Sequence, residues 1–189
     1  MKKLLFHSFI SVLLFLCSCK TKDDFVAINA KYEFLNYFLN LDSPYNMRDC
    51  KFIADRDTAT YGEPKTLTID VIKDFPGGIF TADDLEILDR QRKEASTFKL
   101  DPSRIKDKII VKPNQFKHET DENFWVKFLD KYRTYEFSSV SMPVFSKDMN
   151  TVFIEVADYG FSQGKRLIGM AFKKQNGKWM FYEQLYYYD

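Results

Sequence analysis

An Asn-Gly pair near the C-terminus constrains the fold more than any other feature of this chain. Asn176 and Gly177 separate two runs that are rich in aromatic and aliphatic residues. Both residue types tolerate positive φ, which a two-residue type I′ turn requires at both central positions. The pair therefore predicts a β-hairpin, and residues 134–189 as a whole are typical of four successive strands.

A two-residue turn also fixes the register of the hairpin. It pairs Lys174 with Trp179, Phe172 with Phe181 and Ile168 with Leu185. Side chains alternate between faces, so one face would collect the apolar residues Ile168, Met170, Phe172, Trp179, Phe181 and Leu185. This register places Glu183 opposite Met170, so we expect that face to reach solvent there.

Three tyrosines of the last strand alternate with the predicted core residues and should point to the opposite face: Tyr182, Tyr186 and Tyr188. On the preceding strand, Gly169 and Ala171 are small and would leave room above the sheet. A row of rings beside such residues could stack on a sugar or on an apolar side chain of a partner. Alternatively, the N-terminal helices cover this face and the tyrosines belong to the core.

The first residues of the chain read as an export signal. Two lysines precede an apolar run over residues 4–16, which is too short to cross a bilayer as a helix. The run ends in Leu16-Cys17-Ser18-Cys19, which resembles the lipobox of bacterial lipoproteins. The resemblance implies cleavage after Ser18 and lipid attachment at Cys19, where several acyl chains would hold the protein stably. A plain secretory signal is the alternative.

Residues 20–24 read Lys-Thr-Lys-Asp-Asp and resemble the tether that follows the lipidated Cys in surface-exported lipoproteins of the Bacteroidetes. A solvated linker is the other interpretation. Lys20 directly after the Cys also fits sorting to the outer membrane. The resemblance implies a lipid-anchored outer-membrane protein that faces the periplasm or the cell surface. The predicted division is a signal peptide (1–18), a lipidated tether (19–24) and one domain (25–189).

Composition supports a folded domain and argues against nucleic acid as a partner. The chain contains 19 Phe and 11 Tyr, so we expect a core built on rings or exposed rings that bind a ligand. Removing residues 1–18 takes away Lys2 and Lys3 and no acid, which leaves 26 basic and 27 acidic residues and a net charge of −1. Such a balance gives no basic surface for nucleic acid.

Hydrophobic periodicity predicts three helices before the C-terminal strands. They span residues 25–41, 81–95 and about 120–133. Thr81 and Asp84 have the spacing of a capping box, which explains the acids at that position without a catalytic role. Short strands are expected at 66–72 and 109–111. Helices followed by an antiparallel meander indicate an α+β fold, with N-terminal helices packed on a four-stranded sheet.

The closest named shape for such a layout is a cystatin or nuclear-transport-factor-like cone, an analogy of fold that does not establish function. Residues 145–148 (Phe-Ser-Lys-Asp) and 176–179 (Asn-Gly-Lys-Trp) resemble the C-terminal half of uncharacterised Flavobacterium-type lipoproteins. Residues 80–84 and Gln91 extend this resemblance. The group has no assigned activity, so the resemblance implies a location and no chemistry.

The residues that commonly carry catalysis or bind metals are sparse. After lipidation, Cys50 would be the one remaining thiol; no disulfide could form, and burial as a small hydrophobic residue is favoured. His118 is the one histidine of the mature chain and lacks the companions of a triad or metal site. A calcium loop that begins at Asp55 fails because Thr60 and Thr66 replace its Gly and Glu. We predict no catalytic, cofactor-binding or metal-ligating residues.

Two classes of function remain, and the sequence favours the first. One is a non-catalytic envelope lipoprotein that binds a glycan, peptide or protein, with an immunity protein against an exported toxin as a narrower version. The other is an enzyme that processes a small molecule or glycan, with Glu155, Asp158 or Glu183 as general base. A deep pocket with a buried acid would favour the enzyme, and a flat aromatic surface would favour binding.

Overall fold

The computed structural model describes residues 22–42, 45–55, 72–73, 78–95, 99–116, 121–161 and 164–188. Cys50 and the three acids offered as general bases lie within these ranges. The predicted signal peptide, Cys19 and His118 lie outside them, as does all but the last residue of the strand predicted at 66–72.

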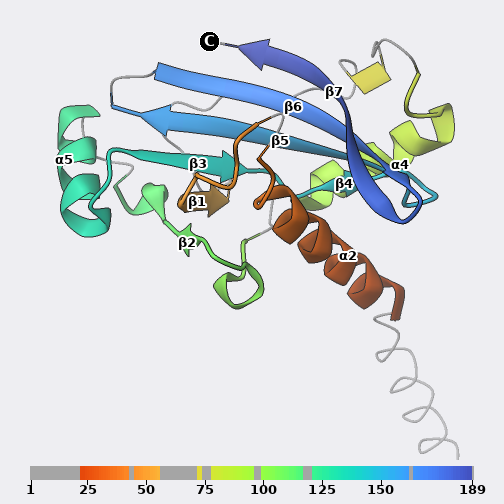
Figure 1. Cartoon of the computed structure of the whole chain (residues 1–189), viewed down its shortest axis with the longest axis horizontal. Helices are drawn as coiled ribbons and strands as arrows, with labels where there is room; N and C mark the ends of the chain where they lie inside the picture. Colours follow the sequence, from red (N-terminus) through yellow and green to blue (C-terminus); the bar gives the residue numbers. More distant parts are fainter. Residues whose placement is uncertain are drawn as a thin grey trace, which may run out of the picture.

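A seven-stranded mixed sheet organises the fold (Figure 1). Its strands are β1 (Phe52–Asp55), β2 (Ile109–Ile110), β3 (Glu136–Val140), β4 (Val144–Phe145), β5 (Thr151–Gly160), β6 (Gly164–Gln175) and β7 (Lys178–Tyr188). Their order is β2-β1-β3-β5-β6-β7, and β4 pairs with β5 beside this path. β1 runs parallel to β2 and to β3, whereas the other neighbours are antiparallel.

The structure confirms a mixture of helices and strands, but it does not confirm the four-stranded meander or the order of elements. In the described part of the chain, the α-helices are α2 (Lys22–Phe38), α4 (Ala82–Ala95) and α5 (Asp121–Tyr132), and β1 and β2 lie between them in the sequence; two 3-10 helices span Pro102–Arg104 and Pro113–Phe116. The strand expected at 109–111 is present as β2. β1 was missed because four residues hold too few alternations to show a period of two.

The turn predicted from Asn-Gly is confirmed. Asn176 has φ 51° and Gly177 has φ 76°, so both residues occupy the left-handed region. Next to the turn, Lys174 pairs with Trp179 and Phe172 with Phe181, as the two-residue loop requires.

Farther from the turn, the predicted register is wrong. The register shifts between Ala171 and Phe172 and again between Gly169 and Met170. Ile168 therefore pairs with Tyr187 instead of Leu185, and Glu183 pairs with Ala171 instead of Met170. Bulges insert unpaired residues into one strand, and the hydrophobic pattern of β7 gives no local signal for them.

Helix α2 covers one face of the sheet. Its buried side chains pack on residues that share the even-numbered face of β5 and β6: Tyr32, Phe34, Leu35, Phe38 and Leu39 against Val152, Ile154, Val156, Ile168, Met170 and Phe172. Phe34 is fully buried and lies 5.3 Å, centroid to centroid, from both Phe172 and Trp179. The core on this face is therefore built on rings, as the composition suggested.

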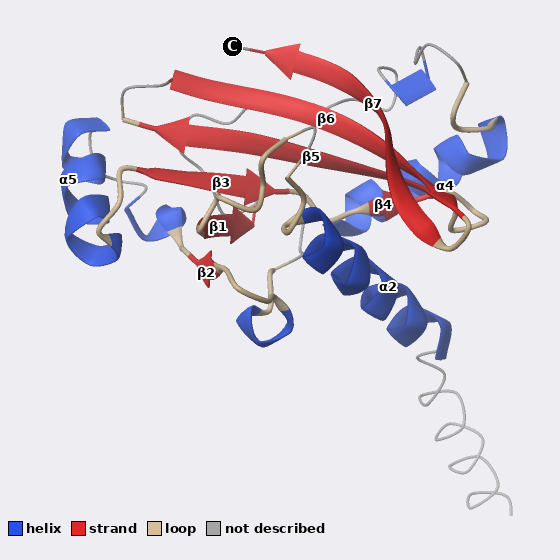
Figure 2. Ribbon diagram, viewed as in Figure 1, coloured by secondary structure: helices blue, strands red, loops and turns tan. Residues whose placement is uncertain are grey.

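Helices α4 and α5 cover the two ends of the opposite face (Figure 2). Leu88 of α4 packs with Phe153 and Ala171, and Phe128 of α5 packs with Phe137 and Ala157. Ala171 is fully buried, so it does not leave open room above the sheet. In the described part of the chain, no helix is both long and apolar enough to cross a membrane.

The capping box at the start of α4 is confirmed. The backbone N–H of Thr81 donates to Asp84 Oδ2 at 2.8 Å, and the N–H of Asp84 donates to Thr81 Oγ1 at 3.2 Å. Asp84 also accepts the N–H of Lys147 from the β4–β5 turn, at 2.8 Å. The acid is thus a structural link between a helix start and a turn.

Candidate ligand pocket

A loop after α2 forms one wall of a pocket. Met47 is fully buried and anchors this loop in the core beneath α2. The N–H of Arg48 donates to the carbonyl of Leu41 at 3.0 Å, and the N–H of Cys50 donates to the carbonyl of Met47 at 3.2 Å. These bonds hold residues 45–50 as a tight turn, which leads into β1.

A lysine from another part of the chain secures the same loop. Lys108 Nζ donates to the carbonyl oxygens of Met47 at 2.7 Å and Arg48 at 2.9 Å. Burial lowers the pKa of Lys108, and nearby groups including Cys50 and Asp107 oppose that effect. The loop is therefore fixed by tertiary contacts.

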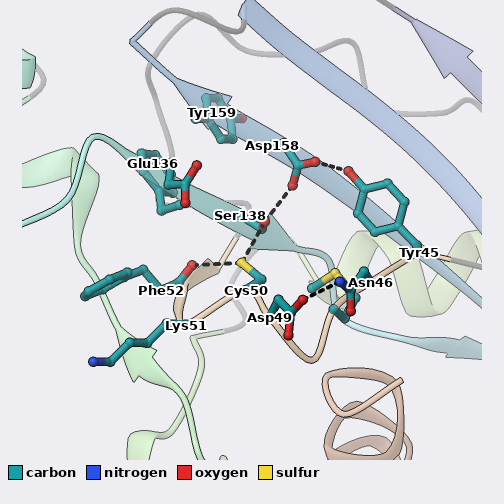
Figure 3. Close-up of a pocket in the computed structure, with 12 residues that line it drawn as sticks. Tyr45, Asn46, Asp49, Cys50, Lys51, Phe52, Glu136, Ser138, Asp158 and Tyr159 are labelled. Atoms are coloured by element: carbon teal, nitrogen blue, oxygen red, sulfur yellow. Dashed lines mark hydrogen bonds between the residues drawn. The ribbon is translucent and has the colours of Figure 1, made fainter. Parts of the chain in front are cut away.

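The pocket has a volume of about 380 Å³, within the range of about 300–1,000 Å³ that is typical of small-molecule sites. It lies between this loop, β1 and the ends of β3 and β5 (Figure 3). Its lining residues are Tyr45, Asn46, Met47, Asp49, Cys50, Lys51, Phe52, Glu136, Phe137, Ser138, Asp158 and Tyr159.

A chain of hydrogen bonds, here named the pocket floor, joins Tyr45, Asp158, Ser138 and Cys50 (Figure 3). The Tyr45 hydroxyl donates to Asp158 Oδ2, and the Ser138 hydroxyl donates to Asp158 Oδ1 at 2.5 Å. Cys50 Sγ lies 3.0 Å from Ser138 Oγ and 3.5 Å from the carbonyl oxygen of Phe52. Residues from three separate segments of the chain thus share one polar network.

The β3–β5 ladder explains why two of these residues meet. Ser138 and Asp158 are register partners, so their side chains project from the same face of the sheet. Val140 and Val156 are the next partners on that face, and they belong to the core under α2. The polar pair therefore continues the core face beyond the end of the helix, where the pocket opens.

The rim of the pocket is acidic. Asn46 Nδ2 donates to Asp49 Oδ2 at 2.5 Å, and Glu136 is exposed on β3 beside Ser138. Among the described lining residues, three acids (Asp49, Glu136 and Asp158) and one base (Lys51) give a net charge of −2.

The polar groups of the pocket floor are held by bonds within the protein. Both oxygens of Asp158 accept hydroxyl hydrogens from within the protein, so the carboxylate is held as part of a network. The neighbours of the Cys50 thiol are a hydroxyl and a carbonyl oxygen, neither of which takes a proton at neutral pH. The twelve lining residues include no histidine, and the described residues contain no group of acids, Cys and His that could hold a metal ion.

The structure separates the three acids that the sequence offered as general bases. Asp158 lies in the pocket floor, Glu155 is buried on the opposite face of the sheet, and Glu183 lies on the edge strand β7. Sequence reasoning missed Tyr45 and Ser138, which are 113 and 20 residues from Asp158. No local pattern marks residues that meet across such separations. Cys50, expected as a small buried hydrophobic residue, is half-buried with polar neighbours.

Of the three β7 tyrosines predicted to stack on a ligand, the structure describes the side chain of one. Tyr182 is 40% exposed, and Lys173 Nζ lies 4.1 Å from the centroid of its ring. The side chains of Tyr186 and Tyr188 lie outside the described part of the structure. Ligand stacking on these three residues therefore stays a prediction.

Comparisons with known proteins assign neither a family nor a function to this chain. No protein-family model matches the chain, and neither the curated proteins nor the solved structures contain a significant match to it.

Proposed function

We propose that this protein is a lipid-anchored envelope lipoprotein of the outer membrane, and that its pocket binds a small ligand without chemical conversion. The pocket floor is the observation that supports ligand binding, because a cavity of ligand size contains a pre-formed polar network built from three separate segments. Sites of this kind are mostly pre-formed, with a few polar groups that orient the ligand.

The position of the predicted lipid supports an aqueous ligand. Helix α2 begins at Lys22, three residues after Cys19, so at most roughly 10 Å of chain can separate the lipid from the helix. The 17 residues of α2 span about 25 Å, and the pocket loop follows its C-terminal end. The anchor would therefore lie at the end of α2 away from the pocket.

The anchor is tested by replacing Cys19 with Ala. The variant should lose labelling by a fatty-acid probe and should be released from membranes, because the acyl chains provide the attachment. The matched variant Cys17→Ala should keep both properties. Labelling that survives in Cys19→Ala, or that is lost only in Cys17→Ala, would contradict the assignment.

Binding is tested through access to Cys50 in the full chain, solubilised in detergent. Alkylation by N-ethylmaleimide, measured on the Cys50 peptide by mass spectrometry, should slow several-fold with a dialysable extract of the cell envelope. A bound compound should be recovered unchanged, whereas an enzyme would convert it. Unchanged alkylation at every extract concentration would eliminate the pocket as a binding site. Loss of protection in Tyr182→Ala but not in Asp158→Asn would place the ligand on β7.

A further inference from the structure

The hydrogens of the pocket floor are already used within the protein. A tyrosine or serine hydroxyl has one hydrogen and two acceptor lone pairs. Tyr45 and Ser138 both direct that hydrogen to Asp158. The Cys50 thiol has one hydrogen, and its two polar neighbours are Ser138 Oγ and the carbonyl oxygen of Phe52, both acceptors. The floor therefore offers a ligand acceptors and no donor.

Acceptors also outnumber donors at the rim. Asn46 directs one of its two amide hydrogens to Asp49, and the carboxylates of Asp49 and Glu136 are acceptors only when ionised. Lys51 is the one cationic residue among the described residues of the lining, and Figure 3 shows its ammonium directed away from the floor. Lys51 Nζ lies 5.8 Å from the centroid of the Phe52 ring.

We propose that the pocket recognises a small primary amine in its protonated form. An ammonium group has three donors and no acceptor, so it complements a surface that has acceptors and a net charge of −2. A neutral hydroxyl would leave its own lone pairs without a donor, and an anion would be repelled. This inference rests on the proposed binding function and names the chemical class of the ligand.

The protonated amine could belong to an amino sugar or to an aliphatic diamine, and matched probes separate these sources from neutral compounds. Glucosamine is compared with N-acetylglucosamine, and 1,4-diaminobutane with 1,4-butanediol. The readout is the alkylation rate of Cys50 in the full chain. At least one amine should slow alkylation several-fold, its neutral counterpart should not, and salt should weaken the protection.

Variants locate the effect. Glu136→Gln should weaken protection about tenfold, because a charge-assisted hydrogen bond becomes a neutral one. The exposed Glu122 of α5 provides the matched control, and Glu122→Gln should leave protection unchanged.

The outcomes distinguish the two proposals. Equal protection by amines and neutral counterparts, or protection by the envelope extract and by no amine, would overturn the ligand class while the binding function stands. No protection by any probe or by the extract would overturn both proposals.

Discussion

Two carboxylates in this molecule, Asp84 and Asp158, accept hydrogen bonds from different kinds of donor. Asp84 accepts the N–H and hydroxyl of Thr81, three residues away, and the N–H of Lys147. Asp158 accepts hydroxyls of Tyr45 and Ser138, 113 and 20 residues away. Two of these three bonds to Asp84 come from the backbone, whereas Tyr45 and Ser138 each use a side-chain hydroxyl to reach Asp158.

This contrast indicates which acid belongs to the fold. Backbone N–H groups cannot turn away from Asp84, and the acid is 7% exposed with no lining role in the pocket. Hydroxyl donors can rotate about their bonds, and Asp158 is half-buried beside a cavity. We therefore expect Asp84 to act on stability and Asp158 on recognition.

The surroundings of Asp84 reinforce its structural role. The side-chain amide of Gln91 donates to the carbonyl of Phe145 at 2.7 Å and accepts its N–H at 3.1 Å. In the following turn, Asp148 accepts the Ser146 hydroxyl at 2.6 Å and the N–H of Asn150 at 3.0 Å. These bonds tie α4 to β4 and to the turn, so the polar groups here have structural partners.

Asp84→Ala should have the greatest effect on stability. Removing the acid leaves the N–H groups of Thr81 and Lys147 without their acceptor and should lower the free energy of unfolding by about 2–3 kcal/mol. Urea denaturation at pH 7 measures it. Asp83→Ala removes an adjacent, exposed acid that contacts Lys147 Nζ at 3.3 Å and should cost at most about 1 kcal/mol. Equal losses in the two variants would refute a structural role specific to Asp84.

The same prediction has a pH dependence. Burial would raise the pKa of Asp84, but the N–H of Lys147 and the N–H and hydroxyl of Thr81 outweigh it, so the pKa lies below the ordinary value of 3.8. The stabilisation is fully present above 3.8 and is lost as pH falls through the lower folded-state pKa. The difference between the parent protein and Asp84→Ala should therefore shrink below about pH 4.

A second locally encoded site, the β6–β7 turn, should give the next largest effect. Gly177→Val places a β-branched residue at φ 76° and should cost about 1–3 kcal/mol, measured by thermal melting. No atom lies within 4 Å of a Cβ added at Gly177, so the cost is backbone strain rather than a clash. Gly177→Asn, a residue that tolerates positive φ, should cost less. An unchanged melting temperature in Gly177→Val would refute the strain.

These local sites are also the part that the sequence predicted well. The Asn-Gly turn, the Thr81–Asp84 capping box and α5 each depend on residues within a few positions of one another. A short stretch of sequence is therefore enough to predict each of these structures. β1 was missed because its pairing is parallel and involves residues 138–140, far along the chain. The bulges in β6–β7 and the pocket floor depend likewise on contacts between distant segments. The composition predicted that aromatic side chains would build the core, but it could not predict which rings would contact one another.

The same isosteric change at both acids should give the sharpest contrast, with the smallest effect on stability at Asp158. In Asp84→Asn, the amide presents an NH₂ group toward backbone N–H donors that cannot turn, so stability should fall markedly. In Asp158→Asn, the hydroxyls of Tyr45 and Ser138 can rotate to donate to the remaining oxygen or to accept from the new amide. The loss should therefore stay below about 1 kcal/mol, but protection of Cys50 by an amine should disappear with the charge. Urea denaturation and Cys50 alkylation measured on the same preparations check the pair. If Asp158→Asn unfolds more readily than Asp84→Asn, or keeps full protection by an amine, then the division between a structural and a recognising carboxylate is wrong.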